Sequence, residues 1–194
     1  MEQHAAESQR VSHEHHHFDT ATEALKAEHR VIERVLDALE KLAKTAESSL
    51  LADWAKAIDF ARNFADQCHH LKEEKLLFPA LEERGIPREG GPIGLMLAEH
   101  EEGRGYVRAM AAALEAAARD PIGARITLRR KADAYIRLLR EHIHKEDEVL
   151  FLLADGVLSS SEQKELLREF EEHELNEMGS GVHEKYLAIV HELS

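Results

Sequence analysis

The feature of this chain that most constrains its fold is a short sequence that occurs twice. Residues 69–78 read HHLKEEKLLF and residues 142–151 read HIHKEDEVLF, so both share the pattern His-x-x-Lys-Glu-acid-x-x-Leu-Phe. A His four residues before a Glu places both side chains on one face of a helix. An Ala-Glu-His triplet precedes each copy, at residues 27–29 and 98–100. Two similar halves, each with one His and then one His-x-x-x-Glu pair, predict a site for two metal ions.

Apolar residues recur at helical spacing over four long segments, at about residues 20–47, 51–83, 92–119 and 121–155. Thr20 and Glu23 form a capping-box pattern at the first start, Gly85 follows the second segment, and Asp120 can cap the fourth. Four prolines and few β-branched residues favour helix over sheet. We therefore expect an all-α fold, an up-down-up-down four-helix bundle with one or two short C-terminal helices.

The rest of the chain divides around this bundle. Residues 1–18 include the run His13-Glu14-His15-His16-His17 and lack a periodic apolar pattern, so we expect a disordered, His-rich N-terminal arm. Residues 19–157 form the bundle in this interpretation. Residues 158–194 contain two short amphipathic segments, which we expect to form a C-terminal helical appendage packed on the bundle.

The apolar stripes of the four segments select the candidate ligands. His29 and His100 lie within the stripes of the first and third helices, and His142 and Glu146 lie at the centre of a fourth stripe that runs through Val149 and Leu153. In the second helix, a rotation of about 100° per residue favours the pair His69/Glu73 over His70/Glu74. The predicted metal ligands are therefore His29, His69, Glu73, His100, His142 and Glu146, with the imidazoles as terminal ligands and the two carboxylates as bridges.

Four imidazoles and two carboxylates in one bundle core are costly to bury unless they bind metal. Imidazole and carboxylate ligands without a thiolate suit iron, manganese or zinc. Six protein ligands on two ions leave coordination positions for a bridging oxygen and a small exogenous ligand. No catalytic residue is predicted beyond these ligands.

The composition narrows the classes of partner and compartment. Lys and Arg total 25 against 38 Asp and Glu, a net charge of −13, which disfavours nucleic-acid binding. No apolar run is long enough to cross a membrane, and the N-terminus lacks the pattern of a signal peptide. The single cysteine, Cys68, fits a reducing cytoplasm. The sequence neither predicts nor excludes a homodimer.

As a set, these motifs resemble the hemerythrin-like (HHE cation-binding) family over about residues 20–155, in the variant with two His-x-x-x-Glu motifs. The resemblance implies an antiparallel four-helix bundle around a non-haem diiron centre with an oxo or hydroxo bridge. Oxygen carriers of the family have a second His four residues after the one at position 100, where this chain has Arg104, so reversible oxygen carriage is not expected. The carrier pattern would use Asp147 as its last carboxylate, whereas the variant uses Glu146.

The resemblance implies a protein that binds or reduces dioxygen, peroxide or nitric oxide for sensing or detoxification, with catalase-like peroxide decomposition as one activity. The alternatives are iron storage or sensing without turnover and a structural dizinc bundle. Additional ligands remain open among Tyr135, Glu177, His183 and Tyr186. Arg104 is expected to face a carboxylate near the missing ligand position, and Cys68 is either a redox-sensitive thiol or a buried packing residue.

Overall fold

The computed structural model describes residues 18–45, 51–177, 179 and 182–193, and its regular structure over these residues is helical throughout. The predicted arm lies, except for residue 18, outside this described part of the chain. Within the described ranges, the helical elements follow one another in this order: α1 (Ala21–Lys44), α2 (Leu51–Phe60), η2 (Ala61–His70), η3 (Glu73–Leu77), α3 (Phe78–Glu83), α4 (Pro92–Ala116), α5 (Pro121–Lys145), η4 (Glu146–Leu150), α6 (Phe151–Val157), α7 (Ser160–Glu177) and α8 (Val182–Leu193).

The predicted start and stop signals act as expected. The Thr20 side chain accepts a hydrogen bond from the backbone N–H of Glu23, and the Glu23 side chain bonds back to the Thr20 backbone, which completes the capping box of α1. Asp120 accepts a hydrogen bond from the backbone N–H of Gly123 and so caps α5. Gly85 has a φ of 86° just beyond α3, a left-handed conformation that glycine adopts without strain.

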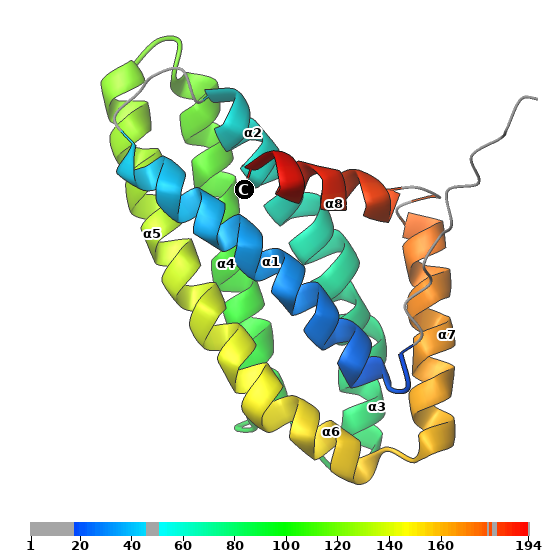
Figure 1. Cartoon of the computed structure of the whole chain (residues 1–194). Helices are drawn as coiled ribbons and strands as arrows, with labels where there is room; N and C mark the ends of the chain where they lie inside the picture. Colours follow the sequence, from blue (N-terminus) through cyan, green and yellow to red (C-terminus); the bar gives the residue numbers. More distant parts are fainter. Residues whose placement is uncertain (1–17, 46–50, 178, 180–181, 194) are drawn as a thin grey trace, which may run out of the picture.

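The elements join into four long helical segments: α1, the continuous run from α2 to α3, α4, and the continuous run from α5 to α6 (Figure 1). Helix α5 packs against α1 and α4, and α2 also packs against α1 and α4. Helix α7 packs against α1, η2 and η3, while α8 crosses α1 and α2 (Figure 1). The two C-terminal helices therefore cover the outside of the first half of the chain.

The core has two apolar clusters, and the predicted ligands lie between them. One cluster lies towards α2 and α8 and includes Ile32, Leu139 and Ile143. The other lies towards α3, α6 and α7 and includes Leu25 and Leu77. On α1, His29 falls between Leu25 of one cluster and Ile32 of the other, so the polar site is enclosed from both ends of the core.

Three π-helical segments, η2, η3 and η4, interrupt the α-helical geometry next to the repeated sequence. The prediction that Val149 and Leu153 face the core was wrong, since they are 52% and 41% exposed, whereas Leu150 and Phe151 are buried. A π-helical turn contains more residues than an α-helical turn, so a stripe drawn at 100° per residue rotates away from the core. The same rotation occurs in the second helical segment, where it changes the expected position of His70.

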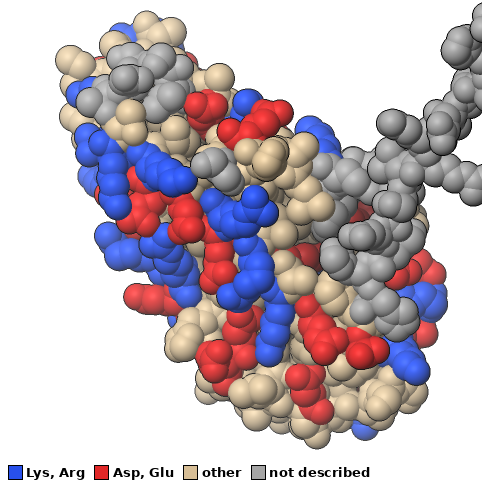
Figure 2. Space-filling view, viewed as in Figure 1, with Lys and Arg blue, Asp and Glu red and all other residues tan. Residues whose placement is uncertain are grey.

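Lys and Arg alternate with Asp and Glu on the face shown in Figure 2, so the charges there are mixed rather than segregated. Among the described helices, none combines the length and the apolar character needed to span a bilayer.

Candidate metal centre

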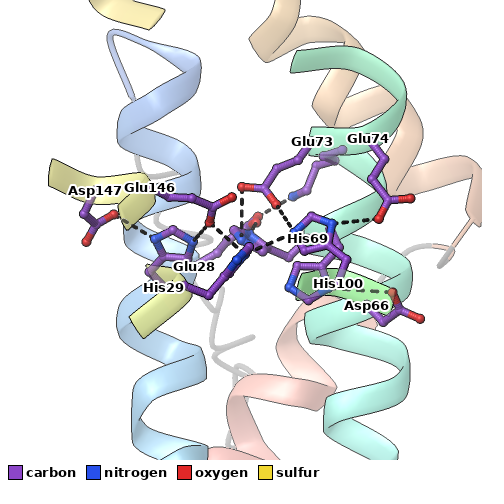
Figure 3. A network of polar contacts seen from close by, with 12 residues as sticks. Glu28, His29, Asp66, His69, Glu73, Glu74, His100, Glu146 and Asp147 are labelled. Carbon is purple, nitrogen blue, oxygen red and sulfur yellow. Dashed lines mark hydrogen bonds and ion pairs between the residues drawn. The ribbon is translucent and has the colours of Figure 1, made fainter. Parts of the chain in front are cut away.

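The six predicted ligands lie together in the interior of the protein. They come from α1, η2, η3, α4, α5 and η4, and each has a relative exposure of 0–1%. Figure 3 shows the side chains of both halves converging on one point between the helices. Because all six are buried, their polar atoms must find partners within this space.

The two glutamates each connect the two halves of the site. One carboxylate oxygen of Glu73 lies 3.6 Å from His69 Nε2, and the other lies 3.5 Å from His100 Nε2. Glu146 Oε2 lies 3.3 Å from His29 Nε2 and 3.2 Å from His142 Nε2. Each carboxylate therefore approaches one imidazole from each half of the site.

The donor atoms form two overlapping groups. His29, His69, Glu73 and Glu146 make up the first, and His70, Glu73, His100 and His142 make up the second; within each group the ligand atoms lie within 4.8 Å of one another. The Nε2 atoms of His100 and His142 are 3.1 Å apart. One ion could contact both nitrogens at the usual metal–nitrogen distance of about 2.1 Å.

Unsatisfied polar atoms show that these residues fit a metal ion. His29 Nε2, His69 Nε2 and all four carboxylate oxygens of Glu73 and Glu146 are buried without a hydrogen-bond partner. Buried polar atoms are rarely left unpaired in proteins, and each one is costly. Oxygen and imidazole nitrogen donors without a thiolate suit iron, manganese or zinc, so bound cations would satisfy these atoms.

The outward-facing nitrogens of the four predicted histidine ligands are held by carboxylates. Each Nδ1 forms a short hydrogen bond with a different acidic side chain: His29 with Asp147 (2.8 Å), His69 with Glu28 (2.8 Å), His100 with Glu74 (2.7 Å) and His142 with Glu99 (2.9 Å). A proton on Nδ1 leaves Nε2 free for a metal and fixes the orientation of the ring. Glu28 and Glu99, the glutamates of the two Ala-Glu-His triplets, thus orient predicted ligands, as does Asp147.

Basic side chains hold these carboxylates in turn. Lys72 binds Glu28 and Lys145 binds Glu99, at matching positions of the two copies. Arg104 lies 2.7 Å from Glu74 and 2.8 Å from Asp66, so it faces carboxylates beside the position where oxygen carriers have a further His. These basic side chains therefore hold in place carboxylates that form hydrogen bonds with the histidines.

The surroundings give the two bridging carboxylates opposite acidities in the metal-free protein. Burial, reinforced by the charge of Glu146, raises the pKa of Glu73 well above its usual range. Burial would raise the pKa of Glu146 too, but His142 and His29 outweigh it and hold this pKa well below the usual range. Against its own burial, Glu146 and then Glu99 raise the pKa of His142 to about 9.

In the first half of the site, burial dominates the pKa of the histidine. Burial lowers the pKa of His69 to about 3, although Glu28 acts in the opposite direction. Burial would raise the pKa of Glu28, but the charge of Lys72 outweighs it and lowers this pKa to about 2. His69 is therefore neutral and Glu28 ionised over the whole neutral range, which is the state that orients an imidazole ligand.

His70 is a buried member of the site that the stripe argument placed on the polar side of its helix. It is only 4% exposed, and its ring stacks on that of His100 with centroids 4.0 Å apart. The expected position of His70 was wrong because η2 is π-helical, so two consecutive histidines both turn inwards; the choice of His69 over His70 as a ligand stays a prediction. Its partner in the rejected pair, Glu74, does not join the ligand groups but accepts the hydrogen bond from His100.

The other residues considered from the sequence fall outside the two donor groups. Burial raises the pKa of the Tyr135 phenol, which opposes the phenolate that a metal would bind. The Tyr186 hydroxyl donates a hydrogen bond to Asp59 and its ring packs on Phe60. Burial raises the pKa of the Cys68 thiol to about 12, which favours the packing role over the redox role. The side chains of residues 177 and 183 lie outside the described part of the chain.

Comparison with known proteins agrees with this geometry. The family model of the hemerythrin HHE cation-binding domain matches residues 20–154. Similar curated proteins include the uncharacterized protein Rv1995 of Mycobacterium tuberculosis and the uncharacterized protein Mb2018 of Mycobacterium bovis. Each is 30% identical over 164 residues, covering 82% of this chain and 63% of the relative, so the match spans less than two thirds of each relative. No solved structure matches this chain. The residues matched by the family model include both donor groups, and the chain belongs to the hemerythrin HHE cation-binding domain family.

Proposed function

We propose that this protein holds two iron ions in an up-down-up-down bundle and binds or reduces small oxygen species for sensing or detoxification. The observation that carries the proposal is the pair of buried carboxylates, Glu73 and Glu146, each of which lies between imidazoles of both halves. Bridging carboxylates hold two ions close together. A centre in which both ions act on dioxygen or peroxide requires such a short separation. When bound, the iron pair would supply the redox chemistry.

The chain's own residues would set the properties of that pair. His29, His69, His100 and His142 would be terminal ligands, each oriented by the carboxylate that accepts the hydrogen bond from its Nδ1. The two apolar clusters on either side would exclude bulk water from the site. Arg104, fixed between Asp66 and Glu74, places a cation where a further histidine ligand stands in oxygen carriers, which argues against reversible carriage.

Metal analysis tests the metal part of the proposal. Protein purified without added metal should contain about two irons per chain, with a near-ultraviolet absorption band from an oxygen bridge between them. Glu146→Ala should lose both ions, because Glu146 approaches a histidine of each half. Glu148→Ala is the matched control, since Glu148 is exposed in the same π-helical segment. Zinc in place of iron would support a structural dizinc bundle and contradict the proposal.

Oxygen evolution distinguishes turnover from iron storage. If the protein decomposes peroxide, two molecules of hydrogen peroxide give two of water and one of dioxygen, with no other reductant. An oxygen electrode should record dioxygen release by the wild type and by Glu148→Ala, and none by Glu146→Ala. A wild type that retains its iron but releases no dioxygen and binds no small ligand would instead be an iron-storage or iron-sensing protein.

A further inference from the structure

A pocket of about 260 Å³ lies beside the metal centre, between η2, α4 and α5. Asp66 and His70 of η2, Gly103 and Arg104 of α4, and Tyr135 of α5 contribute to its wall. His70 also belongs to the donor group with Glu73, His100 and His142. The pocket and the metal centre therefore share a side chain, and the imidazole of His70 stands between them.

The internal repeat explains why the pocket is on this side. In the aligned repeats, the positions of Gly103, Asp66 and His70 correspond to Ile32, Leu139 and Ile143. Those three apolar side chains are 2–3% exposed and belong to one hydrophobic cluster. The space that they fill in one half is left open in the other by a glycine and two polar residues.

His70 differs from the four other buried imidazoles of the centre. Their Nδ1 atoms lie 2.7–2.9 Å from a carboxylate. His70 Nδ1 lies 3.7 Å from Asp66 and is a buried atom without a hydrogen-bond partner. A metal-binding imidazole usually donates its other N–H to such a partner. His70 thus lacks the orienting contact that marks the four ligands, and its Nδ1 has no protein hydrogen-bond partner although the residue lines the pocket.

The charge around the pocket favours an anion. Three guanidinium groups, of Arg62, Arg104 and Arg108, line the pocket against a single carboxylate, that of Asp66. Arg104 is paired with Asp66, Glu74 and Glu101, whereas Arg62 and Arg108 are exposed. In a chain with a net charge of −13, the two exposed arginines at the pocket would attract small anions that the surface as a whole repels.

We propose that small monoanions such as azide reach the metal pair through this pocket, where His70 donates a hydrogen bond to them and is not itself a metal ligand. The proposal rests on the two-metal function above. It gives the ligand a class and a route, and it separates the fifth buried histidine from the four that bind metal.

Cysteine labelling tests the route in metal-free protein. Gly103→Cys should react with a sulfonate-bearing methanethiosulfonate, because a Cβ at Gly103 would make only an ordinary contact of 3.6 Å with the Tyr135 ring. The control is Ile32→Cys at the matching, filled position. Relative to free cysteine, we expect labelling at position 103 to be at least about 10-fold faster than at position 32, and faster with the anionic reagent than with a cationic one. Equal rates at both positions, or a preference for the cation, would overturn the proposal. Wild-type protein sets the baseline, since the thiol of Cys68 is buried.

Azide binding to the iron-loaded protein, followed by stopped-flow absorbance, tests the same route independently. Gln67→Trp at the pocket should slow association and dissociation together, by about 10-fold, and leave Kd unchanged. Arg140→Trp, at the matching position of the second copy and also exposed, should change neither rate. If Gln67→Trp binds azide at the wild-type rate, or if both variants slow equally, the pocket is not the route.

His70→Phe tests the role of the imidazole. We expect this variant to retain two irons per chain and to bind azide about 10-fold more weakly, the effect of losing one hydrogen bond to an anion. Loss of an iron from His70→Phe would show that His70 is a metal ligand. An unchanged azide affinity would show that His70 donates no hydrogen bond to the anion. Either result would overturn the role proposed for His70. A wild type that holds two irons but binds no azide would instead contradict the proposed function itself, together with the route.

Discussion

The two halves of the metal centre make matching contacts in unlike surroundings. In each half a lysine binds the glutamate that accepts a hydrogen bond from the His of the His-x-x-x-Glu pair: Lys72, Glu28 and His69 in the first half, and Lys145, Glu99 and His142 in the second. The Lys72 side chain is 2% exposed, whereas that of Lys145 is 32% exposed. The repeat thus fixes the contacts, and the rest of the fold decides how deeply they are buried.

Helix α7 produces this difference in burial. Its Phe170 ring lies 5.8 Å from Lys72 Nζ, and Glu174 lies 3.6 Å from the same atom. The C-terminal helices therefore do more than cover an apolar surface, because one of them supplies a second carboxylate to the network that orients His69. Removing one partner of an ion pair costs little stability at the surface and much more when the pair is buried.

The largest difference between the halves should appear when each lysine is removed. Lys72→Met leaves Glu28 and Glu174 without their shared cation in a buried site, and we expect it to lower the free energy of unfolding by about 3 kcal/mol. Lys145→Met removes a partly exposed partner and should cost less than about 1 kcal/mol. Urea unfolding of the metal-free variants, followed by circular dichroism, measures both. Equal losses in the two variants would show that burial by α7 does not distinguish the halves.

A smaller difference should separate the two bridging carboxylates when no metal is bound. Glu146 is held ionised by His142 and His29, so Glu146→Gln should destabilise the metal-free protein by about 2 kcal/mol. Burial and the charge of Glu146 raise the pKa of Glu73 and favour its protonated form, so Glu73→Gln should cost less than about 1 kcal/mol. Urea unfolding at pH 7 in the presence of a chelator compares them. The reverse order would show that the proton resides on Glu146 instead.

Sequence patterns predicted much of the fold because the signals were local. The capping box of Thr20 and Glu23 and the cap at Asp120 depend on residues within one turn, and both form as expected. The repeat identified six side chains that the structure brings together, because any helix aligns a His and a Glu four residues apart. Their role as ligands stays a prediction until metal is measured.

The other features of the site could not be predicted from the sequence because they depend on backbone geometry and on contacts between residues far apart in the chain. The inward turn of His70 follows from π-helical hydrogen bonding in η2, which no residue pattern in the chain announces. The pairing of Glu28 with His69, and of Asp147 with His29, joins residues far apart in sequence. The adjacent His69 and His70 were the one indication in the sequence that this helix brings more than one histidine to the site.

The smallest effect that we expect concerns a proton on His142. Its pKa of about 9 lies above the ordinary value of 6.5, so the metal-free protein carries this proton at pH 7.5, while His69, with a pKa of about 3, does not. Because the folded pKa is raised, the proton stabilises the metal-free fold below pH 6.5, and this contribution is lost as the pH rises through 9.

A metal can bind only the neutral ring of His142, so metal binding must displace the proton. Adding ferrous iron anaerobically at pH 7.5 should therefore release up to about one proton per chain from this residue, measured with a pH indicator. Glu99→Gln removes one cause of the raised pKa and should reduce the release, whereas Glu28→Gln, its counterpart beside His69, should not. Equal release from both variants would mean that the two halves hold their histidines in the same charge state and differ only in burial.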